Sequence, residues 1–449
     1  MPVNGSAGPD DVPEDDRIRY RRRANNRAGR RWTLPTVTTL IALVSALVVS
    51  GCSTKAEDTA ASAPAGQGAV RTDVGVTADT ITLGLLTDTT GPFAALGKDV
   101  TFGQQVYWDA KNTAGKVCGR YKVELEIADH GYNVQKVTTQ YSAMRKNVLA
   151  LNQVLGSPMA SALAPDLVKD NVLTIPMAWA LNLADSPAFA LTGPTYDIET
   201  INGLDFLLEQ GLIKKGGPIG HIFHDSEYGA NALLGTKYFA RQHGMTVVEQ
   251  RISALEGDLS SRVTALRAAG VQAIVLTTSP PQAAVAASAT EAAGLRVPLL
   301  GNSPTFQPSL LNTPARDVLI NRFYHSGPNT SLGVPQTKAI AEAIAAERPN
   351  GAFSNGVVTG YVAARIMDAI LTKGCENGDL TRAGVIAAKR SLNNVGTDGL
   401  TGTLDYTQLG VSPSKQNFIA RPDADAPAAS VIVATLYEGP TAKAYKRGA

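Results

Sequence analysis

The sequence predicts an α/β fold built from parallel sheets, and residues 81–133 show its repeating unit most clearly. Their first six residues, ITLGLL, are apolar or small, as a buried strand requires. A loop at 87–97 follows, and from about Lys98 apolar residues recur at the helical period. A second strand alternates over 121–127. Strand, loop, helix and strand in this order form the β–α–β unit of an open parallel sheet.

The same alternation of strand and helix continues along the chain. Further strands are expected at 148–155, 172–176, 218–223, 245–251, 273–277 and 431–436. Helices are expected at 198–212, 233–242, 259–269, 280–293, 336–348, 356–371 and 381–391. Ligands of such sheets bind outside the carboxyl ends of the strands. The loop at 87–97, which contains Leu96, is therefore a candidate wall of a pocket.

The first residues of the chain predict export from the cytoplasm. Arg30 and Arg31 precede an uncharged run at 32–51, which ends in small residues before Cys52. A basic flank, an apolar stretch and small residues before a cleavage site are typical of a signal peptide, here 1–51 with a long polar leader. The residues before Cys52 resemble a bacterial lipoprotein box, in which this cysteine is lipidated. The alternative is an uncleaved transmembrane anchor, because the run is long enough to span a bilayer.

Composition limits what the rest of the chain can be. Residues 52–77 are rich in Ala, Ser, Gly and Thr and predict a flexible tether between the lipid and the folded part. The formal net charge is only +2, and its arginine excess lies within 1–51. The nearly neutral remainder offers no basic surface for nucleic acid.

Three motifs carry a resemblance to a known family. The pattern I-x-x-G-x-L-x-x-x-x-G-P-x-A-x-x-G spans 81–97, D-x-x-Y-G spans 225–229 and G-x-x-G-x-x-x-Y spans 399–406. In this order and at these strand ends, the motifs resemble type I periplasmic binding proteins. The resemblance extends over about residues 78–440. Within the family it is closest to the group that binds branched-chain amino acids and similar small ligands for ABC importers.

The resemblance implies two Rossmann-like lobes with parallel central sheets, joined by a hinge of three strands. The N-terminal lobe would consist of 78–197 plus 325–408, and the C-terminal lobe of 198–324 plus 409–440. A solute would bind between the lobes and favour their closed arrangement. An ABC permease would be the partner of the closed form.

The resemblance also names candidate ligand-binding residues. In the family, the loop corresponding to 156–161 binds the carboxylate of the ligand at a helix N-terminus, and Ser157 and Ser161 are the matching hydroxyls. The alternative for Ser161 is a helix cap. Tyr228, in the D-x-x-Y-G motif, would line the cleft from the second lobe.

Several positions depart from the amino-acid binders. Where they carry a threonine that holds the ligand, this chain has Ala180, beside Ala178 and Trp179. These three residues are expected at or beside the pocket. Trp179 would be either an aromatic ligand surface or a core residue.

The expected partners of a ligand ammonium are also altered. Asp197 is shifted by one residue, and Tyr196 occupies the register of the ammonium-binding aspartate. Asn302 stands where the amino-acid binders have a glutamate, and Ser279 where they have an aromatic residue. A buried ammonium without a carboxylate is costly. An amide, an organic acid or an aromatic acid is therefore at least as good a candidate as an amino acid.

Two cysteines remain if Cys52 is lipidated, namely Cys118 and Cys375. The oxidising compartment and their expected place in one lobe predict a disulfide. The alternative is two partly buried thiols.

Other chemistry finds no support in the sequence. His221 and His224 lie three apart on a strand and point to opposite faces, so they are not expected to share a metal. No nucleotide-binding, nucleophile-elbow or zinc-protease motif is present. We therefore expect a monomeric solute-binding lipoprotein without a cofactor, rather than an enzyme. A ligand-sensing lipoprotein on the same fold, signalling to a receptor, is the alternative.

Overall fold

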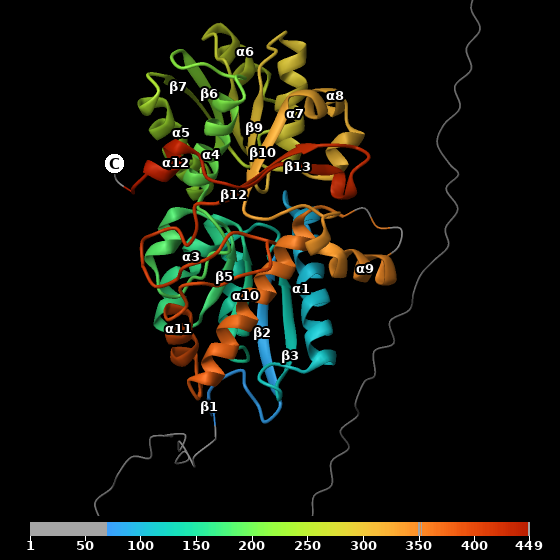
Figure 1. The fold of residues 1–449 in the computed structure, drawn as a ribbon, viewed down its shortest axis with the longest axis vertical. Coiled ribbons are helices and arrows are strands. Elements are labelled where there is room, and N and C mark those ends of the chain that lie inside the picture. The colour runs from blue at the N-terminus through green and yellow to red at the C-terminus, as the bar shows by residue number, and fades with distance from the viewer. Residues whose placement is uncertain (1–69, 349–350, 352, 448–449) are drawn as a thin grey trace, which may run out of the picture. The chain divides into compact units, whose positions relative to one another are not determined.

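Two large, mainly parallel sheets organise the part of the chain that the structure describes (Figure 1). The computed structural model describes residues 70–348, 351 and 353–447. They belong to a compact unit that runs from Ala63 to Ala449. The signal peptide expected at 1–51 and the lipidation site expected at Cys52 lie outside the described residues. Among the helices that are described, none has both the length and the apolar character needed to cross a bilayer.

The first sheet has four parallel strands in the order β3-β2-β4-β5. Their bounds are β2 (Thr80–Thr87), β3 (Lys122–Asp129), β4 (Ala150–Leu155) and β5 (Thr174–Met177). Because successive strand residues point to opposite faces, Ile81 and Leu83 share one core with helices α1, α10 and α11. Leu86 packs on the other face with α2 and α3. The helices are α1 (Ala94–Ala114), α2 (Val134–Met144), α3 (Ser157–Lys169), α10 (Gly356–Glu376) and α11 (Arg382–Arg390). We call this assembly the first lobe.

The second sheet has seven strands in the order β13-β12-β10-β9-β8-β6-β7. Five are parallel: β6 (Pro218–His224), β7 (Thr246–Ile252), β8 (Ile274–Thr277), β9 (Leu299–Asn302) and β10 (Phe323–Gly327). Two antiparallel strands, β12 (Asn417–Pro422) and β13 (Ser430–Tyr437), complete one edge. One face is covered by α4 (Tyr196–Glu209), α5 (Glu227–Gln242) and α12 (Pro440–Ala444). The other is covered by α6 (Ser260–Ala268), α7 (Pro280–Ala292) and α8 (Arg316–Arg322). We call this assembly the second lobe.

The chain crosses between the lobes three times, after β5, after β10 and after α11. Asn329 and Thr401 form an antiparallel bridge between the second and third crossings. The hydroxyl of Thr401 lies 2.7 Å from the carbonyl of Pro328 and 3.2 Å from that of Thr192, in the first crossing. One side chain thus links all three segments. The exact limits given above for the two lobes stay a prediction, but α4 from Tyr196 and β10 up to Gly327 lie with the second sheet.

Two ends of elements differ from the expectation. Helix α1 begins at Ala94, earlier than about Lys98, because the carboxylate of Asp88 accepts hydrogen bonds from the amides of Gly91 and Phe93 and fixes the turn. The expected tether at 52–77 overlaps strand β1 (Arg71–Thr72). This strand pairs in parallel with β11 (Asp379–Leu380), and Arg71 forms an ion pair with Asp379. Part of the predicted tether therefore belongs to a strand.

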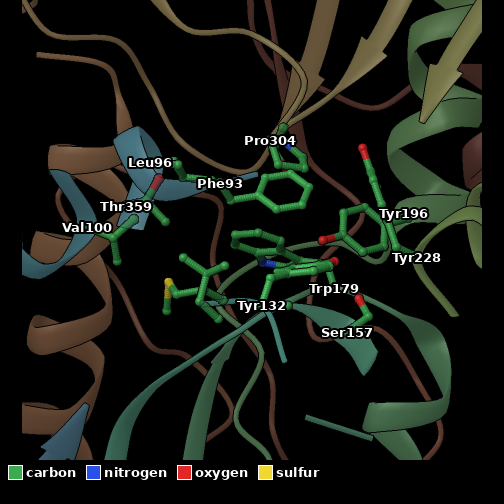
Figure 2. A pocket seen from close by; sticks show the side chains of 14 residues that line it. Phe93, Leu96, Val100, Tyr132, Ser157, Trp179, Tyr196, Tyr228, Pro304 and Thr359 are labelled. Atoms are coloured by element: carbon green, nitrogen blue, oxygen red, sulfur yellow. The ribbon is translucent and has the colours of Figure 1, made fainter. Parts of the chain in front are cut away.

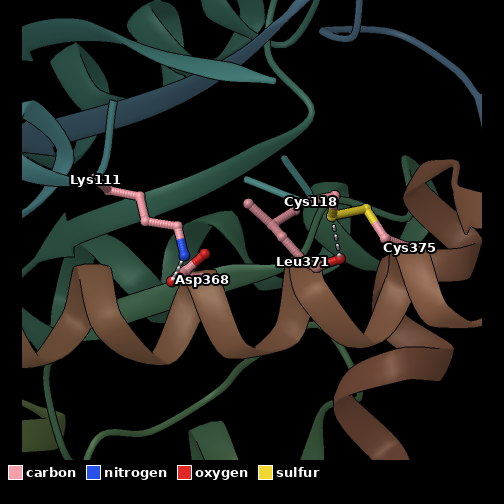
Figure 3. The surroundings of a disulfide bond; sticks show 5 residues. All are labelled: Lys111, Cys118, Asp368, Leu371 and Cys375. Atoms are coloured by element: carbon pink, nitrogen blue, oxygen red, sulfur yellow. Dashed lines mark hydrogen bonds and ion pairs between the residues drawn. A yellow bond between two sulfur atoms is a disulfide. The ribbon is translucent and has the colours of Figure 1, made fainter. Parts of the chain in front are cut away.

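Helices α1 and α10 form the tightest helix pair of the first lobe. Gly103 and Gly360 allow this approach, since a Cβ on either would lie about 2 Å from a backbone oxygen of the other helix, at 2.0 Å and 1.9 Å respectively. Figure 3 shows the other end of the pair, where a disulfide joins Cys118 to Cys375 over a Cα–Cα distance of 6.4 Å. Nearby, Lys111 donates to Asp368 over 2.7 Å. These contacts fix the two helices to each other.

Candidate ligand-binding site

A cavity between the two lobes contains about 490 Å³ of space that no protein atom fills. Figure 2 shows the fourteen residues that line it, which come from the carboxyl ends of strands and from helix N-termini of both lobes. They are Phe93, Leu96, Val100, Tyr132, Leu155, Gly156, Ser157, Met177, Trp179, Tyr196, Tyr228, Ser303, Pro304 and Thr359.

Five of the fourteen lining residues are aromatic (Figure 2). The ring centroids of Phe93 and Tyr132 are 4.9 Å apart, on the first-lobe side. Trp179 meets Tyr196 edge-on at 5.9 Å, and Tyr196 lies 4.6 Å from Tyr228 of the second lobe. The indole nitrogen of Trp179 donates to the hydroxyl of Thr192 over 3.1 Å, so this ring is held in one orientation. Such a wall suits an apolar or aromatic ligand surface.

The N-terminus of α3 supplies a polar corner. Strand β4 ends at Leu155, and Gly156 takes a φ of 101°, which turns the chain directly into the helix. The first turn of a helix leaves backbone N–H groups without an intrahelical partner, at the positive end of the dipole. The side chain of Ser157 is 1% exposed, and its hydroxyl has no hydrogen-bond partner among the described residues. This corner can accept a carboxylate.

Among the described residues, none that lines the cavity has a charged side chain. A buried acid, Glu199, lies one turn into α4, and its carboxyl group accepts hydrogen bonds from the amide and hydroxyl of Ser303 over 3.2 and 3.1 Å. The side-chain amide of Asn302 lies 3.4 Å away. Burial raises the pKa of Glu199 to about 8, so it is mostly protonated near neutral pH. A ligand ammonium would find no ionised carboxylate at the cavity surface.

Five of the residues singled out in the sequence line the cavity: Leu96, Ser157, Trp179, Tyr196 and Tyr228. Leu96 belongs to the first turn of α1 rather than to a loop. The hydroxyl of Tyr228 lies 3.3 Å from that of Thr305, which orients its ring from the second lobe.

Three candidates of the first lobe do not reach the cavity. Ser161 lies one turn further along α3, where its hydroxyl accepts a hydrogen bond from Asn182 over 3.0 Å. Ala178 and Ala180 flank Trp179 but are fully buried in the core, because alternate residues of this extended segment point away from the ligand side.

Three candidates of the second lobe are also occupied elsewhere. Asp197 accepts a hydrogen bond from the hydroxyl of Tyr445 over 2.7 Å and therefore faces α12. Ser279 caps helix α7 in a capping box with Gln282. The amide of Asn302 is used by Thr277, Thr200 and Glu199. The ammonium partners of the amino-acid binders thus have no counterpart on the cavity surface.

Other lining residues carried little signal in the sequence. Phe93 and Tyr132 lie in the segments that follow β2 and β3. The residue types of these loops did not show which side chain points into the cavity. Met177, the last residue of β5, also lines the cavity. Thr359 comes from α10, more than two hundred residues after the first cavity residue, and only the packing of α10 on α1 brings it there.

The histidines next to the site have structural partners. The ring nitrogens of His221 lie 2.8 Å from the hydroxyl of Thr277 and 2.9 Å from that of Thr236, and burial lowers the pKa of His221 to about 3. His224 is bonded to Gln282. Within the ranges that the structure describes, no three potential ligands come together as a metal site.

Comparison with known proteins places the chain in a family. A family model described as periplasmic binding protein matches residues 80–426. The chain belongs to this family. Its members are solute-binding proteins that work outside the cytoplasm for ABC importers, rather than enzymes. No curated sequence matches the chain significantly.

Solved structures show the same fold for this periplasmic binding protein. A fatty acid ABC transporter substrate-binding protein from Thermomonospora curvata is 40% identical, with a TM-score of 0.80 over 84% of this chain and 97% of that one. A branched-chain amino acid ABC transporter protein from Thermus thermophilus with bound valine is 18% identical, with a TM-score of 0.70 over 82% and 99%. A solute-binding protein from Rhodopseudomonas palustris BisB5 in complex with 3,4-dihydroxybenzoic acid is 19% identical, with a TM-score of 0.66 over 81% and 99%.

Proposed function

We propose that this protein captures an apolar carboxylic acid that lacks an α-ammonium group and delivers it to an ABC permease. The observation that carries this proposal is the composition of the cavity surface, which is aromatic and aliphatic, has no charged side chain, and includes a helix N-terminus. The relative from Thermomonospora curvata, 40% identical, is described as a fatty acid binder, which supports the same ligand class.

The two charged groups of an amino acid would meet different surroundings in the cavity. Its carboxylate would be held by the amides of the first turn of α3 and by the hydroxyl of Ser157. Its ammonium would be buried without a carboxylate at the cavity surface, because burial raises the pKa of Glu199 and its carboxyl group is bonded to Ser303, while Asp197 is bonded to Tyr445. An unpaired buried charge costs several kcal/mol, roughly. The same carbon skeleton without the ammonium avoids this cost.

Contacts with both lobes couple binding to closure. The acid would touch Trp179 of the first lobe and Tyr228 of the second, so it stabilises the arrangement that brings them together. The permease would recognise this arrangement. Lipidation at Cys52 would hold the protein at the outer face of the membrane, as a monomer without a cofactor.

Matched pairs of ligands test the proposal. Isothermal titration would compare leucine with 4-methylpentanoate, and phenylalanine with 3-phenylpropanoate, since each pair differs only in the ammonium group. We expect the acids to bind at least about a hundredfold more tightly. Tighter binding of either amino acid would contradict the proposal, because it would require an ionised partner at the cavity.

A pair of serine variants checks the carboxylate corner. Ser157→Ala should weaken acid binding about tenfold or more, the usual effect of losing a hydrogen bond to a charged group. Ser161→Ala is the control, since its hydroxyl is bonded to Asn182 one turn away and should leave the affinity unchanged. Equal effects of the two changes would show that α3 does not hold the carboxylate.

A further inference from the structure

A second cavity adjoins the first between the lobes. It contains about 490 Å³ of unfilled space and shares Leu96, Ser303 and Thr359 with the first cavity. Its remaining walls come from both lobes and from the second crossing: Phe306, Gln307, Pro308, His325, Gly327, Pro328, Asn329, Ser354, Asn355, Gly356 and Ala428. The three shared residues show that the two spaces adjoin each other.

The second cavity differs from the first in its unpartnered polar atoms. Gln307 is only 4% exposed, yet its side-chain nitrogen has no hydrogen-bond partner in the described part of the chain. The side-chain nitrogen of Asn329 is also unpartnered, while its oxygen accepts a hydrogen bond from Thr359 over 3.0 Å. Buried amide groups are nearly always bonded, so both nitrogens remain available as hydrogen-bond donors.

His325, another lining residue, also has an unpartnered atom. Nε2 of His325 lies 3.2 Å from the hydroxyl of Ser430, whereas Nδ1 has no partner among the described residues. Burial lowers the pKa of His325 to about 4, so the ring is neutral and Nδ1 is free to donate in one tautomer. Phe306 stacks on this ring at 5.9 Å and holds it in place.

A helix also begins at this cavity. Ser354, Asn355 and Gly356 line it where α10, a helix of 21 residues, begins. The side chains of Ser354 and Asn355 are already used, by Asp99 and by Ser331. The carboxyl group of Asp99 also accepts a hydrogen bond from the amide of Ser354, so the start of the helix already has an acidic partner. What remains for a ligand is the side-chain amides of Gln307 and Asn329. Both favour an oxygen atom with free lone pairs.

We propose that the second cavity binds a second oxygen-bearing group of the same solute, so that the solute is a difunctional acid. One carboxylate would sit at Ser157 and the apolar chain would cross the aromatic cavity. A terminal hydroxyl, carbonyl or carboxyl group would pass Thr359 and accept hydrogen bonds from Gln307 and Asn329. This inference rests on the proposed function for the first carboxylate and adds the chemistry of the other end.

The test compares three ligand series of equal chain length, from hexanoate to dodecanoate, with the whole protein. The series are the simple acids, the ω-hydroxy acids and the α,ω-dicarboxylic acids. At one chain length or a narrow range of lengths, a difunctional series should bind about tenfold more tightly than the simple acid. The series that binds more tightly than the simple acids identifies the terminal group that the second cavity accepts. Simple acids that bind as well at every length would overturn the inference, and the second cavity would then hold only water.

Variants connect the gain to the second cavity. Gln307→Leu should abolish the advantage of the difunctional ligand and leave the affinity for the simple acid within about twofold. Asn329→Ala should reduce the same advantage. It is the second variant for this test and replaces Gln307→Leu if that variant does not fold. The control Gln135→Leu, on the exposed face of α2, should change neither affinity. A difunctional advantage that survives both cavity variants would also overturn the inference.

This outcome is separable from that of the proposed function. If simple acids bind and amino acids do not, the proposed function stands whatever happens at Gln307. If no acid binds and an amino acid does, the proposed function itself fails.

Discussion

The two lobes contribute walls of different kinds to the cavity. The first-lobe wall is broad and reaches from Phe93 at the start of α1 to Thr359 in α10, and core packing holds its side chains. The second-lobe wall consists of only four residues, Tyr196, Tyr228, Ser303 and Pro304. A layer of buried polar groups holds it from behind, in which Glu199 is bonded to Ser303.

This difference separates ligand contact from lobe geometry. In the first lobe the side chains that would touch the solute are themselves part of the core, so solute affinity should depend mainly on them. In the second lobe the buried acids Asp197 and Glu199 are bonded to Tyr445 and Ser303, so they shape the wall without meeting the solute. Changes in the first wall should therefore act on affinity, and changes behind the second wall should act on stability and its pH dependence.

The largest effect is expected for Trp179→Ala. Removing this ring takes away the central apolar surface of the first wall and should cost about 2 kcal/mol or more of binding free energy, roughly thirtyfold in Kd. Titration with 3-phenylpropanoate measures the loss, and circular dichroism checks that the variant is folded.

The matched variant Trp179→Phe keeps an aromatic face but loses the hydrogen bond to Thr192. It should bind with an intermediate Kd. Unchanged affinity of a folded Trp179→Ala variant would show that the solute does not rest on the first wall.

A smaller effect is expected for Tyr228→Ala in the second wall. This ring closes the cavity over the solute, so its loss should weaken binding about fivefold to tenfold, mainly through faster dissociation. Tyr228→Phe should bind almost as tightly as the unchanged protein, because the hydroxyl reaches only Thr305. Stopped-flow measurement of the dissociation rate distinguishes the two. If Tyr228→Ala weakened binding more than Trp179→Ala, the second-lobe wall would contribute more to solute affinity than the first-lobe wall, contrary to this prediction.

Much of the fold followed from local patterns in the sequence. The run from Ile81 to Gly97 predicts β2, its loop and α1, because apolar periodicity and Gly-Pro turns act within a few residues. Ser157 came from the resemblance to the family, and the loop expected at 156–161 is in fact the start of α3, which begins at Ser157. The strand and turn are consequences of local chain geometry, whereas the role of Ser157 is not.

The rest of the site depends on contacts between distant parts of the chain. Asp197 was expected to face a ligand ammonium, but Tyr445, 248 residues later, binds its carboxylate instead. Thr359 reaches the cavity only because Gly103 and Gly360 let α10 pack closely on α1. The residue pattern within a single helix or strand contains no information about such distant partners. The sequence therefore predicted which strand ends form the site, but not every side chain that lines it.

The last prediction concerns Glu199 and pH. Its pKa is about 8 in the folded protein, against an ordinary value of 4.5, chiefly because of burial. Between pH 4.5 and 8 the folded state therefore keeps a proton that the unfolded state releases, and stability falls as the pH rises. The slope from this one group is at most about 1.4 kcal/mol per pH unit. Above pH 8 its contribution no longer changes.

Glu199→Gln tests this assignment, because the amide preserves the shape of the group but cannot release a proton. Urea unfolding at several pH values should show the unchanged protein losing stability relative to the variant as the pH rises toward 8. Glu209→Gln, at the exposed end of the same helix, is the control and should run parallel to the unchanged protein. A difference between Glu199→Gln and the unchanged protein that stays constant with pH would mean that Glu199 is ionised behind the second wall. The cavity would then have a negative charge close to it, and this charge could stabilise a ligand ammonium.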